Sequence, residues 1–330
     1  MMLASLPEEN DMSIEAVVIG TSLDPASDPV VAAGIAIARR AGARAYLAHA
    51  YPLPAAYYGM PAGMTAVHPQ LLEAEKSAQL ERVAAQLDRL GVEASEIAGQ
   101  VVEIGVAHRL LLETAESTGA GLIVVGAHEG GGLGALLGST AERVLRKAGR
   151  PVLVARGELP LPPSRVLAPV DLSPLSEDAL RRGLDVLDQL AGEEGKAAIE
   201  VEALFVLSEL ERRGSVHFTP EQVDRFAREE LDRLLTRVDP QGERCLRARV
   251  RDGLPRHEIQ AELAARPADL VLIGTHGHSG FERLLLGSVT ASVVRQSPCS
   301  VLVVPPTAAA VERAERDDAD HAAGAARQRR

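Results

Sequence analysis

The chain contains one structural unit twice, and this internal repeat limits its fold more than any other feature. Residues 121–139 read GLIVVGAHEGGGLGALLGS, and residues 269–288 read DLVLIGTHGHSGFERLLLGS. Each stretch is an apolar run followed by a Gly-x-His turn, a glycine-rich segment and a Gly-Ser pair. Gly126 of the first copy therefore corresponds to Gly274 of the second. A repeat of this length in a 330-residue chain predicts two domains of the same fold.

Within each copy, short apolar runs alternate with helical patterns, which gives five strand–helix pairs. Such alternation predicts right-handed crossovers and a parallel sheet with helices on both faces. Apolar residues make up 46% of the chain and aromatic residues only 2%, so the core must consist of Ala, Val, Leu and Ile. This composition suits parallel strands that are buried on both faces. We expect an α/β fold with two tandem, Rossmann-like, doubly wound domains.

The changes in composition along the chain predict five segments. The stretch RGELPLPPS, at 156–164, is rich in proline and reads as a stiff linker. The C-terminal stretch combines many alanines with charged residues, which predicts disorder with room for one helical stretch. The expected boundaries are a flexible arm at 1–13, a first domain at 14–156, a linker at 157–164, a second domain at 165–305 and a disordered tail at 306–330.

Charge and composition argue against several classes of protein. The net charge is −11, whereas nucleic-acid binding needs a basic surface. The longest apolar helical run, at 30–38, is too short to cross a membrane. The two cysteines, Cys245 and Cys299, form neither a disulfide framework nor a metal-type spacing. We therefore expect a cytoplasmic protein with no nucleic-acid or membrane partner.

The glycine spacing differs between the two copies. In the second copy it is G-x2-G-x9-G-S, formed by Gly274, Gly277, Gly287 and Ser288. Backbone amides in such a turn and at a helix start can converge on phosphate oxygens. In the first copy, Glu129 replaces the middle glycine, and the Gly-Ser pair begins one residue early. A side chain in the turn and a carboxylate beside an anion both oppose phosphate binding, so we expect nucleotide chemistry mainly in the second copy.

Asp171 follows the apolar strand VLAPV and precedes a helix. A carboxylate there can accept hydrogen bonds from a ribose hydroxyl or an adenine amine, or hold Mg²⁺ through water. The alternative is an acidic residue that only stabilises the helix N-terminus, and Ser288 could likewise only cap its own helix. Ser22 occupies the matching position of the first copy, which lacks the carboxylate. His276 and His278 form an H-x-H pair, but no third ligand is evident, so no metal site held directly by the protein is expected.

These segments resemble the universal stress protein family in its tandem two-domain form. The resemblance rests on Asp171, on the stretch VLIGTHGHSGFERLLLGSVT and on the closing SVLVV, and it covers about 14–155 and 164–305. It implies five-stranded parallel sheets in the order 3-2-1-4-5, with ATP bound across the strand ends. It also implies antiparallel pairing of fifth strands, here 151–155 with 300–304. That pairing would form an internal pseudo-dimer, and association of two chains into a homodimer stays open.

The resemblance also implies which residues bind ATP, with Mg²⁺ near Asp171. In the second copy these are Pro169, Asp171, Val206, Gly274, His276, Gly277, Gly287, Ser288 and Val289. The matching residues of the first copy form a degenerate site at Gly126, His128, Gly138 and Ser139. Extra glycines in the first copy could rebuild an anion nest, so its ability to bind nucleotide is left open.

The sequence favours binding over turnover. It contains no evident nucleophile–base pair or paired carboxylates, and it lacks the G-x4-G-K-[ST] pattern of P-loop enzymes. We therefore expect an ATP-binding regulatory protein of the stress response. A slow ATP hydrolase, or a weak autophosphorylation at Ser288, is one alternative. Another is a scaffold that binds a protein partner through the Pro/Gly-rich loop 51–69, with nucleotide binding incidental.

Overall fold

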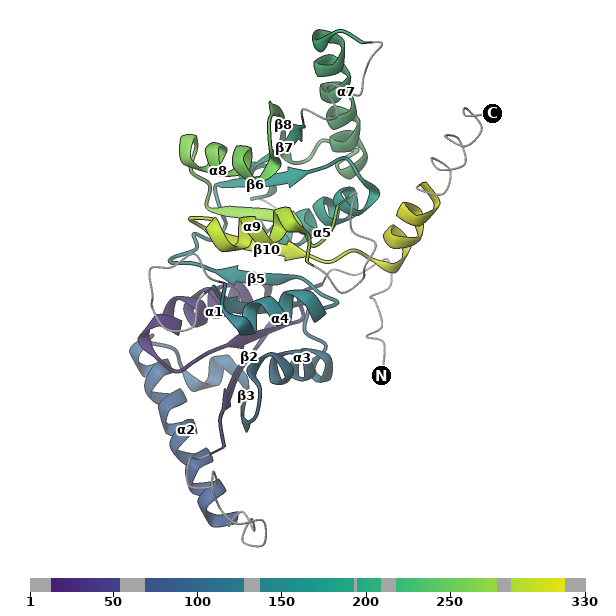
Figure 1. The fold of residues 1–330 in the computed structure, drawn as a ribbon. Coiled ribbons are helices and arrows are strands. Elements are labelled where there is room, and N and C mark those ends of the chain that lie inside the picture. Colours follow the sequence, from purple (N-terminus) through teal and green to yellow (C-terminus); the bar gives the residue numbers. More distant parts are fainter. Residues whose placement is uncertain are drawn as a thin grey trace, which may run out of the picture. The chain divides into compact units, whose positions relative to one another are not determined.

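The computed structural model describes residues 13–53, 69–127, 137–192, 195–208, 218–277 and 286–317 (Figure 1). Contacts divide the chain into two units. The first holds Ile14–Val144 and Ala155–Glu158, and the second holds Leu145–Val154 and the chain from Leu159 onward. Most of the predicted arm at 1–13 and of the loop 51–69 lies outside the described residues, so the proposed partner surface stays a prediction.

The first unit is built around a parallel sheet in the order β3-β2-β1-β4. The first four residues of β1 are fully buried, as expected for a central parallel strand. Its elements are β1 (Ala16–Gly20), α1 (Asp28–Ala41), β2 (Arg44–Tyr51), α2 (Pro69–Arg89), β3 (Ile97–Ile104), α3 (Ala107–Thr118) and β4 (Leu122–Gly126), and α4 (Ser139–Lys147) crosses the division between the units.

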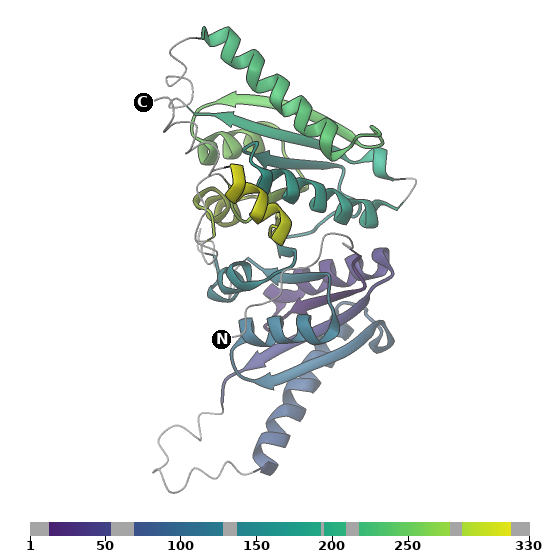
Figure 2. The ribbon, with the colours of Figure 1, turned by 90° about the vertical axis from the view of Figure 1, so that its right-hand side faces the viewer.

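The second unit contains the strand order β5-β10-β9-β6-β7-β8. Helices α5 and α7 contact each other on one face of this sheet, and α8 and α9 contact each other on the other face (Figure 2). Its elements are β5 (Val152–Ala155), β6 (Arg165–Val170), α5 (Pro174–Ala191), β7 (Glu200–Leu207), α7 (Pro220–Val238), β8 (Cys245–Asp252), α8 (Pro255–Ala265), β9 (Leu270–Gly274), α9 (Ser288–Gln296) and β10 (Ser300–Val304).

These sheets confirm the expected α/β fold. The five strands of the second repeat follow the order 3-2-1-4-5, because β6 lies between β7 and β9. The fifth strands of the two repeats, β5 and β10, pair antiparallel with Leu302 opposite Leu153. This is the pairing on which the expected internal pseudo-dimer rests. It also explains why β5 clusters with the second unit.

One glycine in each repeat allows the first helix to pack closely on the sheet. A Cβ atom on Gly34 of α1 would lie 2.6 Å from Ile19, and one on Gly183 of α5 would lie 2.2 Å from Leu272. Both distances are shorter than any normal carbon–carbon contact, so a larger residue would push the helix away. Ser173 caps α5 by accepting a hydrogen bond from the backbone N–H of Ser176, whereas Asp24 makes the equivalent bond with Ser27 in a short 3-10 turn, Pro25–Ser27, that precedes α1.

The segment after β10 forms a helix at residues 308–317, while 318–330 lie outside the described residues, so the expected disorder of the tail stays a prediction. The Asp178 carboxylate of α5 accepts hydrogen bonds from the backbone N–H and the hydroxyl of Thr307, at 3.0 and 3.2 Å. Arg182, one turn further along α5, donates to the carbonyl oxygen of Pro305. Ala310 is fully buried. Two buried charged side chains of α5 therefore anchor the start of this segment.

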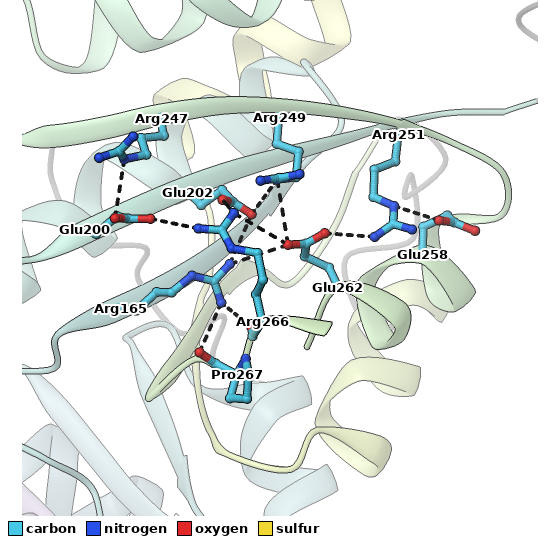
Figure 3. A network of polar contacts seen from close by, with 10 residues as sticks. All are labelled: Arg165, Glu200, Glu202, Arg247, Arg249, Arg251, Glu258, Glu262, Arg266 and Pro267. Carbon is cyan, nitrogen blue, oxygen red and sulfur yellow. Dashed lines mark hydrogen bonds and ion pairs between the residues drawn. The ribbon is translucent and has the colours of Figure 1, made fainter. Parts of the chain in front are cut away.

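An ion-pair network joins the edge strand β8 to β7 and α8 (Figure 3). At its centre are Glu202 and Glu262, whose side chains are 2% exposed. Glu202 accepts hydrogen bonds from Arg249 and Arg165 at 2.9 and 3.1 Å, and from Arg266. Burial by itself would raise the pKa of Glu202, but the arginines outweigh it and hold the pKa below its ordinary value.

Candidate functional site

The carboxyl ends of β6 and β9 meet where the strand order of the second repeat reverses. From β6 the sheet continues to β7 and β8 on one side, and to β9 and β10 on the other. Parallel sheets bind ligands in the crevice at such a point. The structure places the second-copy residues at this edge, either at the ends of β6, β7 and β9 or at the start of α9. They are Pro169, Asp171, Val206, Gly274, His276, Gly277, Gly287, Ser288 and Val289.

The turn after β6 fixes the Asp171 carboxylate. Leu172 has a left-handed backbone with φ 64°, which is unusual for a residue with a bulky side chain and marks local strain. Ser173 then folds back, so that its backbone N–H and its hydroxyl both donate to Oδ1 of Asp171, at 3.1 and 2.6 Å. The carboxylate is thus held at the strand end before any ligand arrives. Leu23 of the first repeat has the same conformation, with φ 63°.

Gly277 lies directly against this carboxylate. A Cβ atom at position 277 would sit 1.9 Å from Oδ2 of Asp171. The sequence predicted that this glycine lets a phosphate approach the turn closely. In the structure, the atom that excludes a side chain belongs to Asp171. The middle glycine of the motif and the strand-end acid therefore form one local unit, and the first copy has lost both.

Gly274 and Gly287 hold the end of β9 against the start of α9. The Gly287 N–H donates to the carbonyl oxygen of Thr275 at 2.9 Å, and the Thr290 hydroxyl donates to the carbonyl oxygen of Gly274 at 2.7 Å. A Cβ atom on Gly287 would lie 3.1 Å from the Thr275 oxygen. The Gly287 amide was expected to bind phosphate, but this internal bond occupies it. His276 places Nδ1 2.9 Å from the Thr275 hydroxyl.

The first amides of α9 have no side-chain cap. Gly287 is the N-cap residue and offers no capping side chain. Ser288 is exposed, and among the described residues no group accepts a hydrogen bond from the backbone N–H of Ser288 or Val289. Unsatisfied N–H groups at a helix N-terminus attract anions through hydrogen bonding and the helix dipole.

The first repeat keeps part of this arrangement. The Gly138 N–H donates to the carbonyl oxygen of Ala127 at 2.9 Å, which matches the bond between Gly287 and Thr275. Ser22 is exposed and supplies no carboxylate. Gly126 ends β4 and Ser139 begins α4. His128, Glu129 and the extra glycines lie outside the described residues, so the degenerate site stays a prediction.

Three residues of this site were not identified from the sequence. Ser173 orients Asp171, while Thr275 and Thr290 join the strand end to α9. Asp171 was a readable signal for this turn, because an aspartate side chain commonly accepts a hydrogen bond from the backbone N–H two residues later. Thr290 had no such signal, because its partner Gly274 is sixteen residues away.

Comparison with known proteins identifies the family. The family model described as Universal stress protein family matches residues 13–156 and again 163–305. The chain belongs to the universal stress protein family. The two matches confirm the tandem organisation, since each covers one of the two repeats of this universal stress protein.

Named relatives agree with this assignment. The chain is 31% identical over 208 residues to a universal stress protein of Mycolicibacterium smegmatis, in a match that covers 60% of this chain and 65% of the relative. It is 35% identical over 144 residues to universal stress protein A homolog 2 of Coxiella burnetii, covering 42% of this chain and 93% of the relative. The crystal structure of a universal stress protein from Archaeoglobus fulgidus shares the fold, with a TM-score of 0.60, 20% identity, and coverage of 90% of this chain and 98% of that one.

Two features are absent from the described part of this universal stress protein. None of its described helices is long and apolar enough to cross a membrane. Within the same residues, no group of three or more His, Cys, Asp or Glu side chains could hold a metal ion.

Proposed function

We propose that the chain binds one adenine nucleotide, with ATP the expected ligand, at the strand ends of the second repeat. The observation that carries this proposal is the start of α9, where two backbone N–H groups without partners among the described residues lie at the switch point of the sheet. Family membership supports a role in the stress response. The nucleotide would make the protein a regulatory module whose state follows ATP occupancy.

The proposed contacts divide into three groups. The amides of Ser288 and Val289 bind phosphate oxygens, and the Ser288 hydroxyl adds one more donor. Asp171, held by Ser173, accepts hydrogen bonds from the ribose or the base, or holds Mg²⁺ through water. Pro169 and Val206 provide the apolar contacts that the base requires. Gly274, His276, Gly277 and Gly287 act as the scaffold that keeps these groups in place.

We propose binding rather than efficient turnover. The contacts above stabilise a bound nucleotide, but they include no general base placed to activate water. Neither Cys245 nor Cys299 forms a disulfide, which fits the cytoplasm, where ATP is available. A slow hydrolysis of bound ATP would be visible as phosphate release. The hydrolysis rate would then set how long the protein stays in its ATP-bound state.

The test is calorimetric titration of the full chain with ATP, using a variant that removes one amide. Ser288→Pro deletes the N–H of Ser288 at the first helical position, where proline is well tolerated. The preceding Gly287 has φ −54° and ψ 146°, which a following proline allows. We expect ATP affinity to fall at least about tenfold, the cost of losing one charge-assisted hydrogen bond.

Two matched variants serve as controls. Ser288→Ala keeps the amide and removes only the hydroxyl, so it should lose less affinity than Ser288→Pro. Ser139→Pro makes the same change at the start of α4 in the first repeat and should leave ATP affinity unchanged. Absence of ATP binding by the unaltered chain, or equal loss in Ser139→Pro and Ser288→Pro, would contradict the proposed site.

A further inference from the structure

The two repeats differ in the layer between their central strands and the helix that follows the second strand. In the first repeat this layer contains a polar seam, which we define as Thr21, His49, Gln79 and Gln86. The matching positions of the second repeat follow from strand register and from the equivalent helices α2 and α7. They are all apolar and buried, namely Val170, Phe205, Ala227 and Leu234. Burying polar groups is costly unless they are hydrogen-bonded, so the seam needs an explanation.

His49 is the titratable residue of the seam. It is 7% exposed, and its Nδ1 lies 2.9 Å from the carbonyl oxygen of Thr21. A carbonyl oxygen can only accept, so Nδ1 carries the hydrogen and Nε2 of the neutral ring has a bare lone pair. This buried Nε2 has no hydrogen-bond partner in the described part of the chain. The ring stacks on Tyr51 with 6.2 Å between centroids.

The amide of Gln79 is already engaged by two neighbours on α2. Its Nε2 donates to Glu75 at 2.8 Å, and its Oε1 accepts from Arg82 at 3.0 Å, which fixes the orientation of the amide. The Gln79 side chain acts on the ring of His49 by favouring the charged form. Neutral His49 and Gln79 therefore each offer an acceptor. A proton on Nε2 would supply the missing donor.

The surroundings nevertheless oppose that proton at neutral pH. Burial lowers the pKa of His49, and the positive charge of Arg82 on α2 lowers it further, while the contacts with Thr21 and Gln79 act in the opposite direction. Tyr51 on β2 stays neutral, because burial and nearby carboxylates raise its pKa. The charged groups around the ring and Tyr51 are Arg82, Glu73 and Glu75 on α2 and Glu103 on β3.

The rest of the seam connects His49 to the packing of α2. The Thr21 hydroxyl donates to Gln86 Oε1 at 2.8 Å, and the fully buried Gln86 donates to Asp28 Oδ1 at 2.7 Å. Arg89, also on α2, pairs with Asp28 at 3.0 Å. Thr21 thus contacts both the imidazole and the amide that holds α2 to α1. A change of charge at His49 therefore acts on a helix whose buried face combines Gln79 and Gln86 with the apolar Val83 and Leu87.

We propose that the polar seam makes the first repeat a proton sensor, in which protonation of His49 at Nε2 loosens α2 from β1 and β2. The proton comes from solvent and forms an N–H that competes with Arg82 for Oε1 of Gln79. The resulting imidazolium repels Arg82 and places a charge inside the layer. The second repeat has Phe205 at this position and does not respond. This response is independent of nucleotide binding in the second repeat.

The direction of the pH response follows from the linkage between proton binding and the opening of α2. Because the pKa of His49 is lower in the packed state than in an opened state, the opened state binds more protons as pH falls below the ordinary histidine value of 6.5. Opening of α2 should therefore increase as the solution is acidified. For one proton the increase approaches about tenfold per pH unit at most.

The experiment is hydrogen exchange of the full chain between pH 7.5 and 5, corrected for the intrinsic pH dependence of exchange. We expect the protection of α2 amides to fall up to about tenfold per pH unit below 6.5, while α7 of the same molecule keeps its protection. His49→Phe copies the second repeat and should remove this fall. The same pH dependence in His49→Phe would assign it to carboxylates and overturn the proposal, as would constant protection of α2 in the unaltered chain.

Two measurements keep the test decisive if His49→Phe does not fold. His49→Gln keeps a polar side chain of similar size that cannot be protonated, and it should also remove the fall. A histidine titration by NMR should give His49 a pKa below 6.5. A value at or above 6.5 would overturn the proposal, because protonation would then stabilise the packed helix.

Discussion

At the scale of single residues, the glycines of the second-copy motif act mainly on the protein itself. Their spacing was readable from the sequence, because glycine is needed wherever a chain must pass close to another atom. The identity of that atom was not readable. For Gly277 it is the Asp171 carboxylate, and for Gly287 it is the carbonyl oxygen of Thr275. These partners are distant in sequence and come together only when β6, β9 and α9 assemble.

A double-mutant cycle tests the contact between Gly277 and Asp171. Gly277→Ala should lower the free energy of unfolding by about 1–3 kcal/mol through overpacking. In an Asp171→Ala background the same change should cost much less, because the 1.9 Å clash with Oδ2 has gone. Equal costs in both backgrounds, measured by urea denaturation, would show that another atom excludes the side chain.

The bond from Thr290 to Gly274 predicts a second residue-scale effect. Thr290→Val keeps the shape and deletes the hydroxyl that donates at 2.7 Å, so stability should fall by about 1 kcal/mol. The start of α9 should also be held less firmly, which lowers ATP affinity in the same titration. Thr236→Val removes an exposed bond within α7 and should change neither quantity. If the two variants have equal stability and equal ATP affinity, the Thr290 hydroxyl does not hold the start of α9.

At the scale of elements, most strands and helices were predictable from the sequence, but the side-chain contacts that join one element to another were not. The apolar runs gave β6, β9 and β10 within a residue or two, because parallel strands buried on both faces read as continuous hydrophobic segments. The attachment of the helical segment at 308–317 was missed, since it depends on Asp178 and Arg182 in α5. The ion-pair network of β8 was missed for the same reason.

The network predicts an acid-sensitive contribution to stability. Glu202→Gln should lower the free energy of unfolding by about 2 kcal/mol at pH 7, because it leaves several arginines without their buried partner. The pKa of Glu202 is lowered in the folded state, so its contribution is present above pH 4.5 and is lost as pH falls further. The difference between the variant and the unaltered chain should therefore shrink in acid.

A neighbouring glutamate provides the matched control. Glu200 pairs with Arg247 and Arg266 at 3.4 and 3.2 Å, but its side chain is 28% exposed. Exposed ion pairs contribute little, so Glu200→Gln should cost less than about 1 kcal/mol. The stability of both variants is measured by thermal denaturation between pH 7 and 3. If both lose a comparable free energy of unfolding, burial is not the reason for the contribution of Glu202.

At the scale of the whole molecule, the chain contains two repeats of one fold with different interiors. The sequence predicted the repeat, the fold and the loss of the nucleotide motif in the first copy, because these depend on local spacing. It did not predict that the first copy carries a polar seam where the second is apolar, since Thr21, His49 and Gln86 belong to separate segments. The two repeats thus share a fold but differ inside: the proposed nucleotide site lies in the second repeat, and the buried His49 lies in the first.

The central claim is that this universal stress protein holds one adenine nucleotide, in its second repeat. Native mass spectrometry of the full chain, purified gently and then supplied with ATP, counts bound nucleotides directly. The account predicts a mass increase of one nucleotide per chain, lost in Ser288→Pro and kept in Ser139→Pro. A chain that stays free of nucleotide, or one that takes up two with equal affinity, would contradict it.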